Sequence, residues 1–340
     1  RSVEDRCIEA FAGDLLQAGA RPAQPRLASV LNDGNGRTVS LRWDGVAGAD
    51  GYYVYYSRDL KTWDAAARFY TTGTTFSVFG FAAPETVAFR VTAVSAAGES
   101  DPSNAYAARC DASASAVLIV DGNTRWQREK SSPENVRGAS HAFTLRYAAA
   151  IAREPFDTCA RDDVRSGAVS LAGYAAVIWA CGQDGAVDHS YDAGDQATVG
   201  SYLAGGGSLL SSGSEIAWDL DRAAQTGAGY HDFCERTLRE TYVADDSNTY
   251  VVRGSGGIFA ALPLAEFRMP GGMTVASADV VAPANGSAAC LEYVGGAGGA
   301  AAVQYAGGYR LVGTGFPLEC LSGADDRAAA IDAVLRFFGL

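Results

Sequence analysis

Three apolar segments of strand length constrain the fold of residues 116–340 more than any other feature. They read AVLIVDGN (116–123), YAAVIWACGQ (174–183) and GGSLLSSG (206–213). Each is apolar without alternation, which is typical of strands that helices cover on both faces. Segments of helical character lie between them, first from Ala139 to Ala152 and then around ATVGSYLA (197–204). The order predicts a three-layer α/β domain with a mostly parallel sheet.

The C-terminal part of this region extends the predicted sheet. ACLEYV (289–294), AAAVQYAG (300–307) and YRLVGTGFP (309–317) have strand character, and RAAAIDAVLRFF (327–338) is an amphipathic helix. Because these strands follow one another without a helix between them, we expect the sheet to be mixed at one edge.

Residues 25–110 have a different pattern, with short strands rich in aromatic and β-branched residues. RTVSLRWDGV (37–46), GYYVYYS (51–57), FSVFG (76–80) and VAFRVTAVSAAGES (87–100) are separated by Gly, Asp and Pro turns. Trp43, the tyrosine run at 52–56 and the ending FRVTAVSAAGESDPS (89–103) resemble a fibronectin type III domain. Such modules are mostly spacers in secreted multidomain proteins, so the resemblance implies location rather than chemistry. Residues 1–24 are predicted to form an N-terminal helix and a linker, and DASASA (111–116) is predicted to be a hinge.

Charge and hydropathy exclude two classes of partner. The 340 residues carry a formal charge of -12, which repels nucleic acid. No apolar run reaches the roughly 18 residues that a membrane-spanning helix requires.

The seven cysteines have no spacing typical of a zinc site. We expect disulfides in an exported protein, with buried thiols in a cytosolic protein as the alternative. Neighbouring strand ends predict a Cys159–Cys181 pair. Cys290 and Cys320 lie on or beside C-terminal strands that should pair, which predicts a second disulfide. A third, Cys7–Cys110, would tie the first helix to the end of the sandwich. Cys234 is then unpaired, and we expect it to be buried on a helix.

Polar residues follow each of the three buried strands. Asp121, Gln183 and Ser214 stand at these strand ends. Because ligands of open α/β sheets bind beyond the carboxyl ends of the strands, we expect these three side chains to contact a ligand.

The order of elements in residues 116–339 resembles the class I glutamine amidotransferase-like fold, which is flavodoxin-like. SLLSSGSE (208–215) then falls at the nucleophile elbow, and TGFPLE (314–319) resembles a degenerate form of a histidine-containing segment. That chemistry needs a thiol and an imidazole. Here Ser212-Gly213-Ser214 and Phe316-Pro317 stand at those places, and only Glu319 remains. We expect no glutaminase activity, and His141 is the histidine best placed to approach the edge.

Glu215 and Asp219 are the remaining catalytic candidates. In a helical turn, side chains at i and i+4 share one face, where they can act as an acid/base pair or share a calcium ion. The alternative is an ordinary helix start in which Ser214 caps the turn and Glu215 favours its dipole. The sequence predicts no metal site, although calcium remains possible.

The segments VLIVDG, YAAVIWACG, YLAGGGSLLSSGSEIAWDLD, GAAAVQY and GFPLE resemble a secreted bacterial group described as xanthan-lyase-like or golvesin-associated. The resemblance implies an extracellular or cell-surface location and work on cell-envelope or polysaccharide material. We expect a non-catalytic or degenerate-enzyme module that binds or presents such components. The alternatives are a hydrolase of polysaccharide or peptidoglycan, acting through Glu215 and Asp219, and a structural surface or fibre protein.

Overall fold

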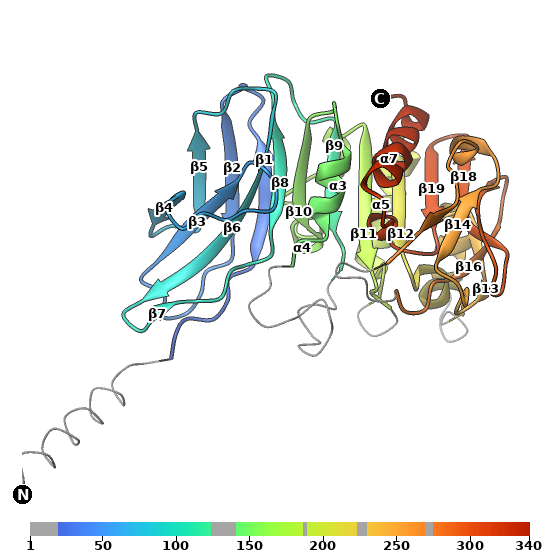
Figure 1. Ribbon diagram of the computed structural model, residues 1–340, viewed down its shortest axis with the longest axis horizontal. Helices are drawn as coiled ribbons and strands as arrows, with labels where there is room; N and C mark the ends of the chain where they lie inside the picture. Colours follow the sequence, from blue (N-terminus) through green and yellow to red (C-terminus); the bar gives the residue numbers. More distant parts are fainter. Residues whose placement is uncertain (1–19, 124–140, 186–188, 223–229, 269–274) are drawn as a thin grey trace, which may run out of the picture.

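The computed structural model describes residues 20–123, 141–185, 189–222, 230–268 and 275–340 (Figure 1). A 14-stranded mixed sheet runs along the molecule, and a 5-stranded sheet packs beside its N-terminal end. No helix in the described ranges is long and apolar enough to cross a membrane. The predicted N-terminal helix lies outside the described residues.

The predicted sandwich is confirmed. One of its layers contains β1 (Leu27–Asn32), β2 (Thr38–Trp43) and β5 (Thr75–Phe79). The other contains β3 (Gly51–Ser57), β4 (Arg68–Thr71), β6 (Glu85–Ser95), β7 (Gly98–Glu99) and β8 (Tyr106–Cys110). Their inward side chains form one core, in which Trp43 meets Tyr52 edge to face with ring centroids 5.5 Å apart.

The sandwich is joined to the rest of the chain by a continuous sheet. Strand β1 pairs antiparallel with β10 (Phe156–Ala160), placing Ser29 opposite Cys159. The Asp157 carboxylate accepts a hydrogen bond from the backbone N–H of Asn32, 2.7 Å away. Ladder pairing and packing therefore connect the two parts directly, in addition to the short segment that was expected to act as a hinge.

Five strands are parallel, and their order in space differs from their order in the chain. They are β9 (Val117–Asp121), β10, β11 (Ala176–Gly182), β12 (Ser208–Gly213) and β19 (Arg310–Thr314). Strand β9 lies between β10 and β11, followed by β12 and β19. The sheet thus grows in one direction from β9 and then in the other, which places a topological switch point between β9 and β11.

Helices cover both faces of these strands. On one face, α3 (Thr144–Ala150) and α7 (Ala324–Phe338) share a core with the sheet (Figure 1). On the other, α5 (Ala193–Ala204) packs with residues of β11 and β12. Helix α5 begins with a capping box between Asp192 and Asp195, which satisfies backbone donors of its first turn. Helix α4 (Arg161–Arg165) directly follows β10.

The sheet is mixed at its C-terminal edge, as expected: β19 pairs parallel with β12 and antiparallel with β18 (Ala300–Ala306), and the strands beyond it pair antiparallel. These strands are more numerous than expected. Predicted strands correspond to β17 (Ala288–Tyr293), β18 and β19. Strands β13 (Glu240–Ala244), β14 (Val251–Gly254), β15 (Ala265–Glu266) and β16 (Val280–Pro283) were not predicted, because they are short and only partly apolar. The short helices are η2 (Leu171–Gly173), η3 (Trp218–Arg222), α6 (Tyr230–Asp232), η5 (Phe233–Thr237), η6 (Gly257–Phe259) and η7 (Leu318–Cys320).

The disulfide predictions were wrong for the described cysteines. All six of these are buried, and no disulfide joins any two of them: Cys110, Cys159, Cys181, Cys234, Cys290 and Cys320. Cys159 and Cys181 are not on neighbouring strands, because β9 lies between β10 and β11. Two strand spacings of about 4.8 Å exceed the Cα separation that a disulfide spans. Cys320 lies in η7 rather than on a strand beside Cys290, and Cys7 lies outside the described residues.

Candidate functional site

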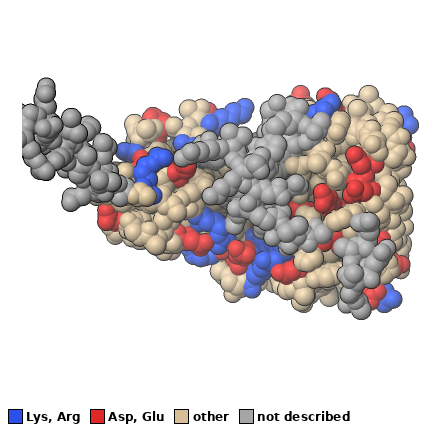
Figure 2. Space-filling view, turned by 90° about the horizontal axis from the view of Figure 1, so that it is seen from below, with Lys and Arg blue, Asp and Glu red and all other residues tan. Residues whose placement is uncertain are grey.

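The parallel strands end at one edge of the sheet, which faces the bottom of Figure 1 and the viewer in Figure 2. Acidic and basic side chains are both visible on this side of the molecule (Figure 2). The strand ends of β9, β11 and β12 carry the residues that the sequence analysis predicted as ligand contacts. Their contacts decide which of them a ligand can reach.

Asp121, at the end of β9, lies inside the junction with the sandwich. Its carboxylate accepts a hydrogen bond from the Tyr106 hydroxyl of β8 at 2.8 Å, and His141 Nε2 is 3.2 Å from the same oxygen. All three side chains are buried. Burial, reinforced by Asp121, raises the pKa of Tyr106 well above its usual value, so this hydroxyl stays a donor. Asp121, predicted as a ligand contact, and His141, predicted to approach the edge, are thus buried with Tyr106 between the sandwich and the sheet.

Gln183 and Ser214 are also buried. The Gln183 side chain and the Ser214 backbone form hydrogen bonds with the backbone of neighbouring segments. Gln183 Oε1 accepts a hydrogen bond from the Ala276 N–H at 2.7 Å. Ser214 donates its N–H to the Gly182 carbonyl, and its own carbonyl accepts from Asp279 N–H, both at 2.9 Å. These positions hold the loops in place without presenting a side chain to solvent.

The predicted elbow is part of a buried hydrogen-bond network. The Tyr147 hydroxyl of α3 donates to Glu319 Oε2 at 2.6 Å and lies 2.9 Å from Ser212 Oγ. Ser212 Oγ also accepts from the Leu318 N–H at 2.8 Å. Phe316, where the resemblance placed a histidine, is fully buried and stacks on Phe267 with centroids 4.5 Å apart.

This network, Tyr147–Ser212–Glu319, is unsuited to nucleophilic catalysis. Burial and the nearby Glu319 carboxylate raise the pKa of Tyr147 well above its usual value. Ser212 has no exposed surface and no imidazole beside it. A serine needs an adjacent base and access to substrate before it can attack a carbonyl. The arrangement is therefore that of a packed core.

The acidic turn is helical, as predicted, but its two carboxylates have different surroundings. The Asp219 N–H donates to the Glu215 carbonyl at 2.9 Å. Asp219 is 1% exposed, and its oxygens accept from His189 Nδ1 at 2.9 Å and from the Ser190 N–H at 2.7 Å. Glu215 is half-buried beside Gly185. Of the two alternatives drawn from the sequence, the acid/base or cation-sharing pair is disfavoured, because Asp219 is buried and bonds to His189 and Ser190.

His189 is the residue of this edge that the sequence analysis did not select. Its backbone is in the left-handed region, with φ of 59°, and its carbonyl accepts a hydrogen bond from Arg161 Nη1 at 2.6 Å. Its ring stacks on Tyr230 with centroids 5.3 Å apart. The side chain is 37% exposed, whereas its partner Asp219 is fully buried. The only sequence signal was the position of His189 in the loop after a buried strand.

Two further acids are buried near this edge: Glu240, the first residue of β13, and Asp279, directly before β16. Glu240 is buried, and its Oε2 has no hydrogen-bond partner among the described residues. Burial, with a smaller effect of Asp221, raises the pKa of Glu240 to about 8. Burial likewise raises the pKa of Asp279 well above its usual value. Within the described ranges, no three His, Cys, Asp or Glu side chains are placed to hold a metal ion.

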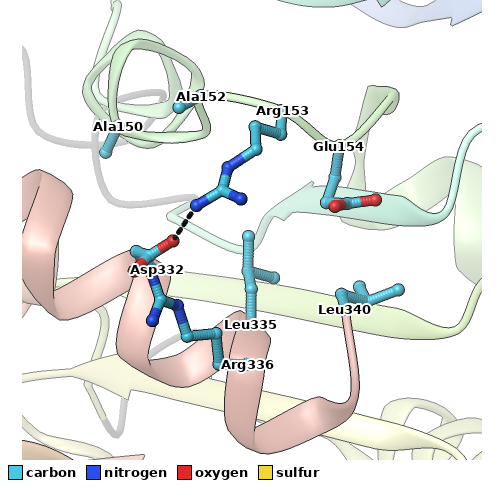
Figure 3. A pocket seen from close by; sticks show the side chains of 8 residues that line it. All are labelled: Ala150, Ala152, Arg153, Glu154, Asp332, Leu335, Arg336 and Leu340. Atoms are coloured by element: carbon cyan, nitrogen blue, oxygen red, sulfur yellow. Dashed lines mark hydrogen bonds and ion pairs between the residues drawn. The ribbon is translucent and has the colours of Figure 1, made fainter.

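A small cavity lies at the opposite edge of the sheet (Figure 3). It has a volume of about 60 Å³, and its lining includes Arg153, Glu154, Asp332 and Leu335. Arg153 and Asp332 form an ion pair across its rim at 3.5 Å. Small-molecule sites usually enclose about 300–1,000 Å³, so this cavity is too small for a ligand of that kind.

Fibronectin type III domains are among the solved structures similar to this chain, and they match about 27% of it. FN3tt is 23% identical, covers 28% of this chain and 99% of its own, and has a TM-score of 0.25. The FN1-FN3 domains of chicken CNTN1 are 21% identical, over 27% of this chain and 33% of theirs, with a TM-score of 0.25. A beta-1,2-glucanase from Parabacteroides distasonis is 21% identical, over 27% of this chain and 13% of its own, again with a TM-score of 0.25. No family model and no curated protein matches the chain.

Proposed function

We propose that the chain is a secreted degenerate-enzyme module that binds or presents polysaccharide or cell-envelope components at the carboxyl edge of its sheet. The observation that carries the proposal is the Tyr147–Ser212–Glu319 network. Under the proposed resemblance the elbow falls at Ser212, and the side chains there are buried, hydrogen-bonded to one another and inaccessible to substrate.

The arrangement of the parallel strands supports a glutamine amidotransferase-like, flavodoxin-like domain as the ancestry of this module. In chain order the strands lie second, first, third, fourth and last across the sheet, which is the doubly wound order of that fold. In such sheets ligands bind outside the carboxyl ends of the strands. This position favours the edge near His189 and Glu215 over the small cavity at the opposite end.

The location and ligand class rest on the resemblance to the secreted xanthan-lyase-like group. The sandwich favours this location through its resemblance to fibronectin type III modules, which are mostly spacers in secreted multidomain proteins. Here the β1–β10 ladder attaches the sandwich directly to the sheet.

Two assays test the proposal. The full chain should bind at least one polysaccharide or peptidoglycan preparation in affinity electrophoresis or sedimentation, and it should release no ammonia from glutamine. Glutaminase activity that disappears in Ser212→Ala would contradict the account of the elbow. Turnover of a glycan that disappears in Glu215→Gln would favour the hydrolase, and assembly into fibres without glycan binding would favour the structural protein.

A further inference from the structure

The three histidines of the chain differ in what holds their ring nitrogens. His141 is buried, with Nε2 against Asp121. His231 has both nitrogens beside carboxylates, with Nδ1 2.5 Å from Asp221 and Nε2 3.1 Å from Glu235. His189 uses only Nδ1, toward Asp219, and none of the described residues bonds to its Nε2. His189 is thus the histidine with an available ring nitrogen on a partly exposed side chain.

The partner of Nδ1 determines the chemistry of Nε2. An ionised carboxylate only accepts hydrogen bonds, so Nδ1 carries the proton that bonds to Asp219. In the neutral ring, Nε2 then carries a lone pair and is a hydrogen-bond acceptor. Asp219 is a positioning residue in this arrangement, because it selects the tautomer and holds the ring plane.

Buried polar groups hold the backbone and the ring of His189. Arg161 is 1% exposed, donates from Nε to Asp195 at 2.7 Å and holds the His189 carbonyl. A non-glycine residue in the left-handed region is strained and persists only where its surroundings enforce the conformation, and such residues cluster at ligand sites. At His189 two hydrogen bonds enforce this conformation: the one that Arg161 donates to the His189 carbonyl and the one between the His189 ring and Asp219. The available nitrogen is therefore fixed before any ligand arrives.

The charges near His189 restrict the ligand. Arg161 pairs with Asp184 and Asp195, and Arg165 also pairs with Asp195. Asp219 bonds to His189, and Glu215 lies beside Gly185, whose carbonyl accepts the His189 N–H. Four carboxylates thus face two arginines in this region. The protein as a whole carries a formal net charge of -12 at pH 7. Such a field repels carboxylates and favours neutral or positively charged groups. The ring of Tyr230 adds a flat apolar surface beside the acceptor.

We propose that His189 Nε2 is the central acceptor of a glycan site at the carboxyl edge, and that its ligand is a neutral or amino-sugar polymer rather than a uronic-acid polymer. This inference rests on the proposed function and adds to it the ligand class and the recognising atom. Hydroxyl and ammonium groups of the sugar donate to Nε2, and the acidic surroundings exclude carboxylate-bearing chains.

The test is titration of the full chain with three hexasaccharides: a glucosamine oligomer, a neutral glucose oligomer and a uronic-acid oligomer. We expect the first or second to bind and the third to bind at least tenfold more weakly. His189→Ala should weaken binding at least tenfold, and His189→Gln, which keeps an acceptor, should recover part of the loss. Asp219→Asn should also weaken binding. The matched control, His231→Ala, should leave the dissociation constant within about twofold.

The outcomes separate the two proposals. If the wild-type chain binds none of the three oligomers and no envelope preparation, the proposed function fails and the inference with it. If it binds but His189→Ala binds equally well, only the inference fails. Equal or tighter binding of the uronic-acid oligomer overturns the ligand class. Carbethoxylation by diethyl pyrocarbonate gives an independent readout: His189 should react first in the folded chain, and bound oligomer should protect it.

Discussion

Glu240 should make the folded protein lose stability as the pH rises. Glu240 is the first residue of β13, and its carboxyl group is buried, with Oε2 close to Gly313 of β19 and without a hydrogen-bond partner among the described residues. Burial, and secondarily Asp221, raises its pKa from 4.5 to about 8. Between these values the folded state retains a proton that the unfolded state releases, so the free energy of unfolding falls with pH.

The magnitude follows from the same shift. Each pKa unit corresponds to about 1.4 kcal/mol, so a rise of about 3.5 gives a total contribution of about 5 kcal/mol. This stability is fully present below pH 4.5, declines between pH 5 and 8, and is lost above pH 8. Glutamine has the shape of the protonated acid and does not titrate. Glu240→Gln should therefore remove this part of the slope.

Urea unfolding at pH 5, 6, 7, 8 and 9 measures the effect. The free energy of unfolding of the wild type should fall relative to Glu240→Gln by about 1 kcal/mol per pH unit, and the variant should be the more stable protein at pH 8. Glu292→Gln, which alters an exposed carboxylate paired with Arg253, is the matched control and should keep the wild-type slope. Equal slopes for wild type and Glu240→Gln would refute the reasoning.

Three further predictions concern other parts of the fold. Tyr147→Phe should lower the free energy of unfolding by about 1–3 kcal/mol in urea titrations, because Glu319 loses its buried donor; an unchanged value would contradict the network. Glu215→Gln should change stability by no more than about 1 kcal/mol, whereas Asp219→Asn should cost more, since it weakens two buried hydrogen bonds. The six described cysteines should resist a thiol reagent in the native protein and all react after unfolding, and a disulfide-linked pair found by peptide mapping under non-reducing conditions would contradict this assignment.

The parts of the fold that follow from local pattern were predictable from the sequence. The buried strands β9, β11 and β12 are continuous apolar runs, and the sandwich strands carry aromatic and β-branched residues at regular spacing. The pairing of β1 with β10 was not predictable, because it joins residues about 130 positions apart and no local signal marks an edge that continues another sheet.

The site was harder to predict than the fold, for two physical reasons. Order along the chain is not order in space, so placing β9 between β10 and β11 removed the expected Cys159–Cys181 contact. The partners of a side chain are also set by tertiary contacts. Asp219 was selected with Glu215 by their helical spacing, but it bonds to His189, 30 residues earlier in the chain. Asp121 was predicted to face a ligand and is instead covered by Tyr106 of the sandwich.

The most direct test of the account is amide hydrogen exchange of the full chain with and without a bound glycan. Protection should appear in residues 183–185, 189–190 and 214–219, at the carboxyl edge, and not at residues 150–154 around the small cavity. Protection confined to the sandwich, or to the edge that carries the cavity, would contradict a ligand site at the carboxyl ends of the parallel strands.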